Sequence, residues 1–464
     1  MNTTSAATKA QLFQEMHAKG SVLNGWSAVL NISGDYLARR VRRQWPTDQA
    51  GTHSVTLLSA QPLPPGPGAA NALRGVGQMT FILGEPAVSV VHGRSALTIS
   101  HPIRQVLGRS GNATAMPTAA DAASVAWHTD SAVNVPAHPA ARVDIEVPLV
   151  VRPAGSGASG FDIVLDAAAA SATAHQLPAA AGDGGALVQH LMNALGDSNG
   201  TLLVATVDGS TQADTPALQP RSLALLTVRT PSGNQVLQVH FTTGDTPAPT
   251  GTGVDLGEPL PVVDGADWSL MFSSQKVFQD VVAPEFNTLS QHVKLAAAAP
   301  AGGRGAWFLQ TQNRMYFAGT VDWGNAMPPV NQQAQIGLNF TGSPNEGLVV
   351  STYTDPGANV DLQFEIAQNY RVTCSGNPGQ QSLSFAGTQA TVAGAGVAEN
   401  TFKPYLDQIL SQEIRSDLDA TSLASLAAFA LRTVRFPGDE TVIDAVQIPG
   451  DLVMVGNFDP DAKA

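Results

Sequence analysis

The chain has 464 residues, of which 13% are charged, with a formal net charge of −13 and a pI near 5.1. This length allows two domains or one elongated double domain. The acidic balance argues against a nucleic-acid binder, because such a protein needs a basic surface to displace counterions from phosphates.

The single cysteine and the N-terminal residues set further limits. With only Cys374 present, no internal disulfide and no multi-cysteine metal site is expected. Residues 1–20 lack the apolar run of a secretory signal, so we expect no signal peptide and leave the compartment open, cytoplasmic or non-classically exported. No run of about eighteen apolar residues occurs, which predicts no transmembrane segment and leaves peripheral membrane contact open.

The chain begins with a predicted helix, strand and second helix. Residues 6–18 have helical spacing, and Trp26 opens a short apolar strand. An amphipathic helix is predicted at 34–45, where Pro46 stops it. From 53 to 166 short β-branched runs separated by Gly, Pro and Asn predict a long β-meander.

The rest of the first half mixes one helix with further strands. An alanine-rich stretch at 167–182 is interpreted as a surface loop. A second amphipathic helix is predicted around Leu187, Leu191 and their neighbours, and strands follow up to Thr242. Residues 245–266 are rich in Pro and Gly without periodicity, which favours a crossover between two units.

The second half repeats this order of elements. A helix is predicted at 274–283, ending before Pro284, and strands are predicted between 292 and 375. A helical region at 403–432 and a final strand pair around Pro449 complete the chain.

Two stretches in the halves are alike. Trp26-Ser27 and Trp268-Ser269 each begin an apolar strand, which ends in a serine followed by a helical pattern. With one residue of gap, Ser33 aligns with Ser274, an offset of 241 residues and about half of the chain. A fixed internal offset of this kind predicts two copies of one long unit.

The residues give little sign of catalysis. The histidines form no H-E-x-x-H pattern, and no G-x-S-x-G elbow supplies a nucleophile, so we expect no metal, no cofactor and no enzymatic activity. A carbohydrate-type β-sandwich enzyme is disfavoured because paired acidic motifs are absent from the sequence.

The sequence resembles a known superfamily. Gly25-Trp26-Ser27, the stretch from Phe272 to Pro284, Leu218-Gln219-Pro220 and Ile448-Pro449-Gly450 occur in the order seen in the tubular lipid-binding (TULIP) superfamily. Within it the chain is similar to the bacterial OrfX-type proteins encoded beside clostridial neurotoxin genes. The resemblance covers most of the chain, although each motif is short.

The resemblance implies an α+β fold of two TULIP-like halves, each a long curved antiparallel β-sheet wrapped around an amphipathic helix. We place the first half at 1–244, the crossover at 245–266 and the second half at 267–464. The implied function is binding of a lipid or other apolar small molecule, with a protein partner in a toxin-type complex. A structural scaffold with closed cores and no ligand is the alternative.

Two sets of residues are candidates for ligand contact. The apolar helix stripes would line a groove, with plain core packing as the alternative: Leu37, Val41, Val277, Phe278, Val281 and Val282. A cluster of arginines would attract anionic headgroups, since Arg presents paired donors to phosphate, with a solvated and neutralised helix face as the alternative: Arg39, Arg40, Arg42 and Arg43.

Overall fold

The structure is a computed structural model. It describes Leu12, Gln14 and residues 21–44, 53–61, 74–113, 125–128, 133–154, 160–177, 185–195, 201–229, 235–249, 262, 265–291, 294–300, 307–312, 315–321, 330–343, 347–355, 364–387, 391–394, 415–448 and 450–459.

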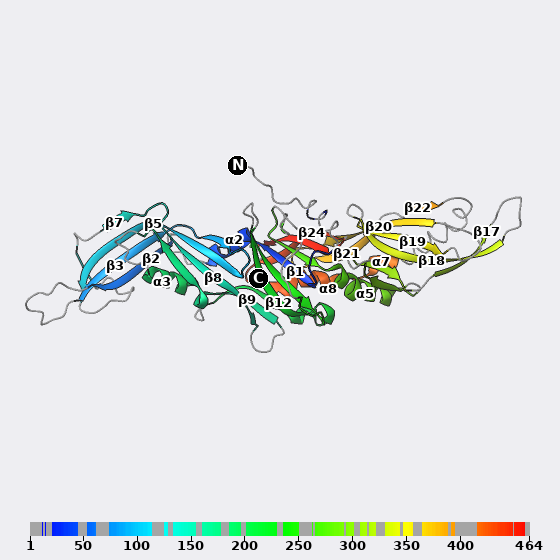
Figure 1. Cartoon of the computed structure of the whole chain (residues 1–464), viewed down its shortest axis with the longest axis horizontal. Coiled ribbons are helices and arrows are strands. Elements are labelled where there is room, and N and C mark those ends of the chain that lie inside the picture. The colour runs from blue at the N-terminus through cyan, green and yellow to red at the C-terminus, as the bar shows by residue number, and fades with distance from the viewer. Residues whose placement is uncertain are drawn as a thin grey trace, which may run out of the picture.

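The molecule is elongated, with sheet along most of its length (Figure 1). A central six-stranded sheet contains β12 (Pro220–Arg229), β13 (Gln235–Thr243), β1 (Ala28–Ser33), β14 (Trp268–Phe272), β25 (Leu452–Asp459) and β24 (Glu440–Gln447), in that order. The strands that pair in the described residues are all antiparallel, which confirms the expected antiparallel α+β fold.

A second, eleven-stranded sheet forms one end of the molecule. Its strands are β2 (His53–Gln61), β3 (Arg74–Leu83), β4 (Ala87–Val90), β5 (Ala96–Ala113), β6 (Ala126–Trp127), β7 (Val133–Pro136), β8 (Arg142–Pro153), β9 (Gly160–Asp166), β10 (Ser171–His175), β11 (Thr201–Asp208) and β23 (Val434–Arg435).

An eight-stranded sheet forms the other end. It contains β15 (Leu295–Ala298), β16 (Phe308–Thr311), β17 (Met315–Val321), β18 (Val330–Ser343), β19 (Gly347–Asp355), β20 (Phe364–Ser375), β21 (Ser382–Gly387) and β22 (Thr391–Gly394).

Helices lie against these sheets. They are α2 (Gly34–Gln44), α3 (Gly185–Leu195), α4 (Ser274–Lys276), a π-helical segment Val277–Val282, α5 (Ala283–Leu289), α7 (Arg415–Ala420), α8 (Ala424–Ala428) and a second π-helical segment Phe429–Thr433; short 3₁₀ turns occupy Ala167–Ala169, Gly209–Gln212 and Pro216–Leu218.

The two copies meet in the central sheet. β1 and β14 pair antiparallel through Leu30 and Leu270, and β13 and β25 flank them on either side. Each copy supplies three strands. From its own edge of the sheet inward, each contributes its next-to-last strand (β12 or β24), its last strand (β13 or β25) and its first strand (β1 or β14). The duplicated halves thus share one continuous sheet, and the short β23 also crosses over to pair with β11 of the first half.

Both faces of the two middle strands of the central sheet, β1 and β14, are buried. Alternate residues of β1, including Leu30 and Ile32, join the main hydrophobic core, while Val29 points the other way. Val29 packs with Trp26, Met271 and the buried Leu12 in a smaller cluster. Because neither face is exposed to water, β1 and β14 are apolar at most positions rather than strictly alternating.

The helix starts after β1 and β14 show how the copies correspond. Ser33 Oγ accepts a hydrogen bond from Tyr36 N at 3.1 Å, and Ser273 Oγ accepts one from Lys276 N at 3.3 Å. The two N-caps show that Ser33 is structurally equivalent to Ser273. The sequence alignment of Ser33 with Ser274 was therefore wrong by one residue. The cap geometry, not the apolar spacing, fixes the correspondence.

The second helix is longer than predicted. We expected it to end before Pro284, but the helical path continues through α5 to Leu289. The π-helical segment precedes the proline, and Ala283 N bonds back to Phe278 O. This wider turn, with Pro284 at the start of α5, accommodates a residue that has no N–H and would clash in a regular helix interior.

Two other predictions are revised. The alanine-rich stretch is not simply a loop, because Ser171–His175 forms β10 and pairs with β8. Of the helical region predicted at 403–432, residues 403–414 lie outside the described residues, and the rest is split between α7, α8 and the second π-helical segment. Most of the first helix predicted at 6–18 also lies outside them.

Candidate functional site

The predicted apolar stripes lie in the main core. Leu37 and Val41 of α2 occupy the positions four and eight residues after Ser33, and Val277 and Val281 stand at the same positions after Ser273. All six candidate residues are nearly inaccessible, with exposed fractions of 2% for Leu37, 4% for Val41, 3% for Val277, 3% for Phe278, 5% for Val281 and 0% for Val282. The structure thus closes this part of each stripe by packing.

The apolar surface of the first half extends beyond that closed packing. Helix α3 packs against β2 of the eleven-stranded sheet, below it in Figure 1. On the same sheet face Val55 pairs with Phe81, and both are buried. One step along the strands Leu57 pairs with Met79, and these two are only partly buried. The apolar face of the sheet therefore keeps some exposed surface at Leu57 and Met79.

Helix α3 also carries apolar side chains that are only partly buried. Leu187 and Leu191 are fully buried against the sheet, and Val188 and Met192 are partly buried at the edge of the core. Gln189 and His190 face solvent. The helix is thus amphipathic, as predicted, and its apolar side faces the sheet. We call Leu57, Met79, Val188 and Met192 the apolar rim.

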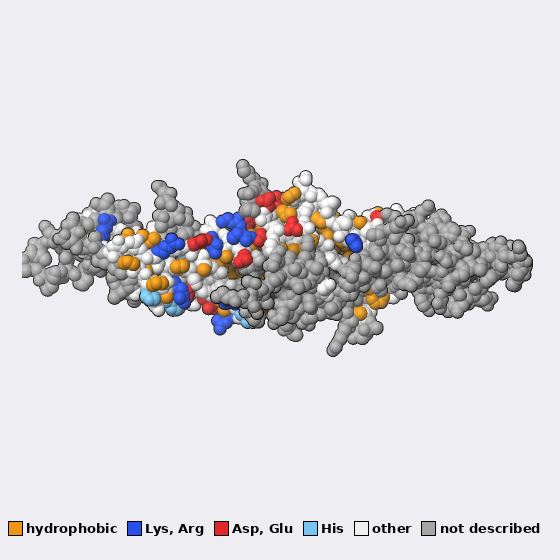
Figure 2. Space-filling model, turned by 90° about the horizontal axis from the view of Figure 1, so that it is seen from above, with side chains coloured by type: hydrophobic (Ala, Val, Ile, Leu, Met, Phe, Trp, Pro, Cys, Tyr) orange, Lys and Arg blue, Asp and Glu red, His pale blue; other side chains and the backbone are white. Residues whose placement is uncertain are grey.

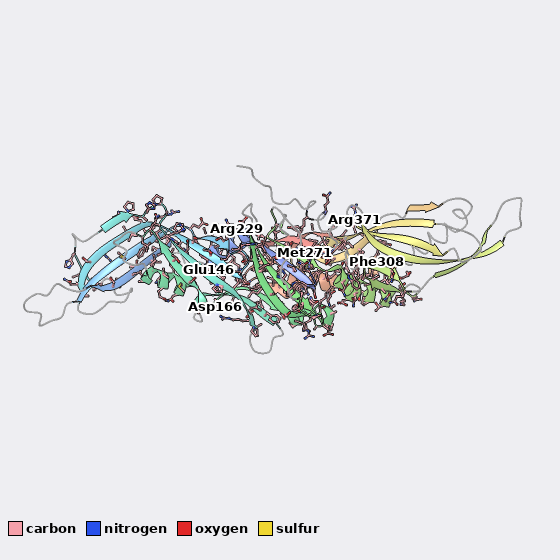
Figure 3. The ribbon with its side chains drawn as sticks, viewed as in Figure 1. Glu146, Asp166, Arg229, Met271, Phe308 and Arg371 are labelled. Carbon is pink, nitrogen blue, oxygen red and sulfur yellow. The ribbon has the colours of Figure 1, made fainter. Side chains whose placement is uncertain are left out.

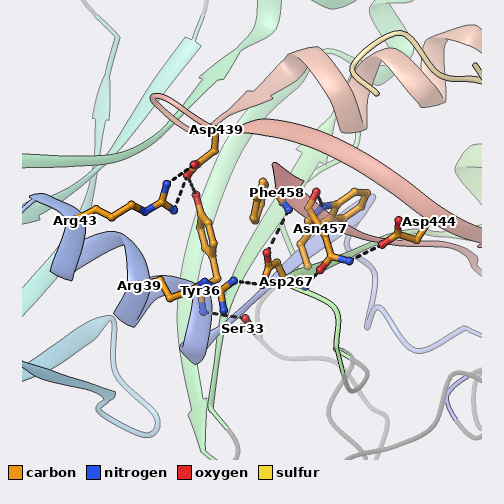
Figure 4. Close-up of polar contacts among 10 residues, drawn as sticks. Ser33, Tyr36, Arg39, Arg43, Asp267, Asp439, Asp444, Asn457 and Phe458 are labelled. Atoms are coloured by element: carbon orange, nitrogen blue, oxygen red, sulfur yellow. Dashed lines mark hydrogen bonds and ion pairs between the residues drawn. The ribbon is translucent and has the colours of Figure 1, made fainter. Parts of the chain in front are cut away.

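Two of the predicted arginines bind a single buried carboxylate. Asp439, whose side chain has no exposed surface, accepts hydrogen bonds from Arg40 Nη1 at 3.1 Å and Arg43 Nη1 at 2.7 Å. The Tyr36 hydroxyl donates to the same carboxylate at 2.5 Å (Figure 4). Arg40 is itself buried and also donates to Pro437 O. These hydrogen bonds and ion pairs hold α2 against the turn before β24.

The cluster shifts the acid–base behaviour of its members. Burial and the hydrogen bond to Asp439 raise the pKa of the Tyr36 hydroxyl, so it stays protonated as a donor. Burial by itself raises the pKa of Asp439, but hydrogen bonds from Arg43 and Tyr36 and the charges of Arg43 and Arg40 outweigh it and hold that pKa below its ordinary value. Asp439 therefore remains an anion at neutral pH.

The other two arginines are also paired. Arg39 bonds to Asp267, which in turn accepts from Phe458 N at 3.2 Å (Figure 4). Arg42 contacts Glu85 at 3.0 Å. Figure 2 shows blue and red side chains interspersed near the middle of the displayed face. The arginine side of α2 is thus largely neutralised by carboxylates, which is the alternative that the sequence left open.

Side chains crowd the middle of the molecule between sheets and helices (Figure 3). Among the residues that the structure describes, no group of three or more His, Cys, Asp or Glu side chains could hold a metal ion. No helix in the described ranges is long and apolar enough to cross a membrane.

Comparison with solved structures identifies the fold. The structure of P47 of Clostridium botulinum E1 aligns with a TM-score of 0.53 at 7% sequence identity, covering 94% of this chain and 100% of that one. This chain has the fold of P47. The resemblance to the TULIP superfamily and its OrfX-type members is confirmed at the level of fold.

Two further structures align over most of their length. P47 from Clostridium botulinum A2 gives a TM-score of 0.49 at 10% identity, covering 94% of this chain and 97% of that one. A lipopolysaccharide binding protein gives 0.30 at 12% identity, covering 94% and 99%. No family model and no curated protein matches the sequence.

The P47-like fold separates what the sequence located from what it missed. The sequence located the apolar helix stripes but did not decide whether they are packed shut. Residue spacing shows which side chains face a sheet, but not how tightly the sheet packs against them. It missed Leu57 and Met79, whose cross-strand pairing joins residues 22 positions apart. The alternation of Val55 and Leu57 along β2 was the available signal.

Proposed function

We propose that this protein binds a lipid acyl chain or a similar apolar molecule between α3 and the inner face of the eleven-stranded sheet. The observation that carries the proposal is the partial burial of the apolar rim, whose four side chains pack against the main core and keep some exposed surface. A fold of the TULIP kind, a curved sheet around an amphipathic helix, supports the same placement.

The physical driving force is the removal of methylenes from water. Each buried methylene contributes about 0.8 kcal/mol, so an acyl chain of roughly twelve carbons gains near 10 kcal/mol before the cost of ordering it. The apolar rim offers contact without any polar group that would lose hydration. No catalytic chemistry is required for such binding.

The six core residues play a supporting part in this proposal. Leu37 and Val41 belong to the same continuous core against which the apolar rim packs, and they help to keep that core closed. Val277, Phe278, Val281 and Val282 hold the equivalent place in the second copy. We propose that ligand contact begins at the apolar rim rather than at these stripes.

The arginines are proposed to aid binding only through their exposed members. The side chains of Arg39, Arg42 and Arg43 are 51%, 41% and 44% exposed, whereas Arg40 is 6% exposed. Reversal of all four charges would disrupt the Asp439 cluster, so Arg42→Glu is the informative variant. It should weaken binding to vesicles containing phosphatidylserine at low salt if Arg42 attracts headgroups, and unchanged binding rejects that role.

A fluorescent fatty acid tests the main proposal. Full-length protein is titrated with cis-parinaric acid, whose emission rises in an apolar environment. Val188→Trp fills the slot and should abolish the rise, whereas Gln189→Trp places the same side chain on the exposed side of α3 and should preserve it. Equal binding by both variants, with both folded by circular dichroism, would exclude this slot.

A scaffold function is the second candidate, and a specific observation favours it. The six stripe residues are packed shut, and each of the four arginines has a carboxylate partner. In that case the protein holds a protein partner and takes up no parinaric acid. A stable partner of fixed stoichiometry without any fatty-acid binding would select this alternative.

A further inference from the structure

A polar cavity lies where the two copies meet. It has a volume of about 850 Å³ and is lined by the loop before β1, the segment after β13 and the start of the helix that follows β14. This volume falls within the range of small-molecule sites, roughly 300–1,000 Å³. The cavity is formed by different residues from the apolar rim, and nothing in the proposed lipid binding uses it.

The lining favours a particular class of ligand. Hydroxyl and amide side chains form much of it, including Ser21, Thr246, Gln275 and Gln279, and the large apolar side chains among the described lining residues are the rings of Trp26 and Trp307. The aliphatic side chains among the described lining residues are small ones, those of Pro216, Ala217 and Pro247. Burying these polar groups against hydrocarbon would leave them without hydrogen bonds, which is costly.

The charges in the wall are balanced. Lys276 Nζ bonds to Asp280 Oδ2 at 2.7 Å, and both side chains are more than four-fifths buried. Arg221 and Asp245 add one further charge of each sign. Because the positive and negative side chains are equal in number, the cavity does not favour a phosphate or a metal cation over a neutral molecule.

The helix geometry presents polar groups to the cavity. Gln279 and Asp280 belong to the π-helical segment Val277–Val282, and π turns occur frequently at functional sites. Gln275 Nε2 donates to Gln279 Oε1 at 3.2 Å. This contact leaves Gln275 Oε1 as an acceptor and Gln279 Nε2 as a donor for a ligand with hydroxyl groups.

We propose that this cavity binds a neutral oligosaccharide. Sugar hydroxyls match the mixed donors and acceptors of Gln275, Gln279 and the serines. The half-buried Trp307 offers an indole face on which the C–H side of a pyranose ring can lie. A neutral, hydroxyl-rich ligand is the one class that the amides, the aromatic ring and the balanced charges all accommodate.

Calorimetric titration of the full chain tests the proposal. The probes are maltotriose, cellotriose and chitotriose, with inorganic phosphate and sodium laurate as comparisons. At least one trisaccharide should bind, and Gln279→Ala should weaken it about tenfold, the loss expected for one or two hydrogen bonds. Gln279 is exposed, so this variant should fold normally. Trp307→Ala should reduce binding further.

Matched controls make the result decisive. Gln189→Ala removes an exposed amide from α3, outside the cavity, and should leave saccharide binding unchanged. Val188→Trp should also leave it unchanged, so that failure of the lipid proposal and failure of this one are told apart. No binding of any trisaccharide, equal binding by Gln279→Ala, or phosphate binding that depends on Gln279 would each overturn the proposal.

Discussion

At the scale of single residues, Asp439 joins α2, near the start of the chain, to the turn before β24, near its end. Its buried carboxylate holds Arg40, Arg43 and Tyr36, all from α2. Removing one partner of a buried charge cluster leaves the others uncompensated, at a cost of about 3–5 kcal/mol. Asp439→Asn should therefore lower the free energy of unfolding by an amount in this range, measured by urea denaturation.

An exposed ion pair provides the control for that prediction. Glu85, 65% exposed, pairs with Arg42. Glu85→Gln should change the free energy of unfolding by less than about 1 kcal/mol, because water and salt screen exposed pairs. If both substitutions changed the free energy of unfolding equally, the Asp439 cluster would not stabilise the protein as a buried ion-pair cluster.

A second buried carboxylate predicts an unusual pH dependence. Asp451 is fully buried and accepts hydrogen bonds from Val22 N at 2.9 Å, Ser274 N at 2.8 Å and Ser21 Oγ at 3.1 Å. Burial, only partly offset by these bonds, raises the pKa of Asp451 to about 6. The folded protein therefore holds this proton at a pH where the unfolded chain has lost it.

The sign of the effect follows from proton linkage. Because the folded pKa of Asp451 is raised, its contribution to stability is fully present below about pH 4 and is lost as the pH rises to about 6. The free energy of unfolding should fall by roughly 3 kcal/mol over this interval. Asp451→Asn should remove the fall in urea denaturations across these pH values. A variant with the same pH profile as the parent would contradict the assignment.

Residue chemistry was only partly predictable from the sequence. The arginine cluster was visible as a pattern, but Asp439 lies 396 residues beyond Arg43, and nothing local connects them. Charge pairing across such a separation depends on the fold. The sequence therefore located the cations and left their role open.

At the scale of elements, the contact between β14 and β25 depends on a glycine. Trp268 of β14 pairs with Gly456 of β25, and its indole Nε1 donates to Asn457 O at 3.2 Å. A Cβ at Gly456 would lie 1.9 Å from Val442 O and 2.6 Å from Trp268 Cζ2. Gly456→Ala should thus destabilise the protein by about 1–3 kcal/mol or more, through forced strand displacement.

Gly84 is a suitable control position, because a Cβ added there lies farther from its neighbours than one added at Gly456. A Cβ there would lie 3.2 Å from Arg104 Nε and 3.3 Å from Pro102 Cβ, so these neighbours need to move only slightly. Gly84→Ala should therefore have a clearly smaller effect on the thermal midpoint. If Gly456→Ala were tolerated as well as Gly84→Ala, close packing of Trp268 would not be needed to join the strands.

The elements themselves were predicted unevenly. Helices α2 and α3 followed from apolar spacing and from Pro46, because both signals are local. The continuation of a helix past Pro284 was missed, since a π turn has no simple sequence pattern. β10 was missed because alanine has weak strand propensity and packs against β8 only through tertiary context.

At the scale of the whole molecule, the shared central sheet predicts that the halves depend on each other. Cutting the chain between 244 and 267 would expose the edge of β1, whose residues are almost all buried in the intact protein. The fragment 1–244 alone should be unstable and rapidly proteolysed, and the full chain should unfold in one main transition. A stable fragment would show that the proposed boundaries mark independent domains.

The duplication was predictable, but its assembly was not. Repeated Trp-Ser strands and helix starts indicated two copies, and the fold confirms two related halves. Strand alternation indicates which face is buried but not which distant strand lies alongside. The pairing of β1 with β14 and the partly exposed apolar rim therefore emerge only from the three-dimensional arrangement.

Native mass spectrometry of the purified full-length protein tests the proposed lipid binding most directly. If the apolar rim holds an acyl chain, the protein should retain a co-purified lipid or acquire one after incubation with palmitate, and Val188→Trp should lose it while Gln189→Trp keeps it. Bare polypeptide mass for the parent protein under both conditions would contradict lipid binding and leave the scaffold function as the better alternative.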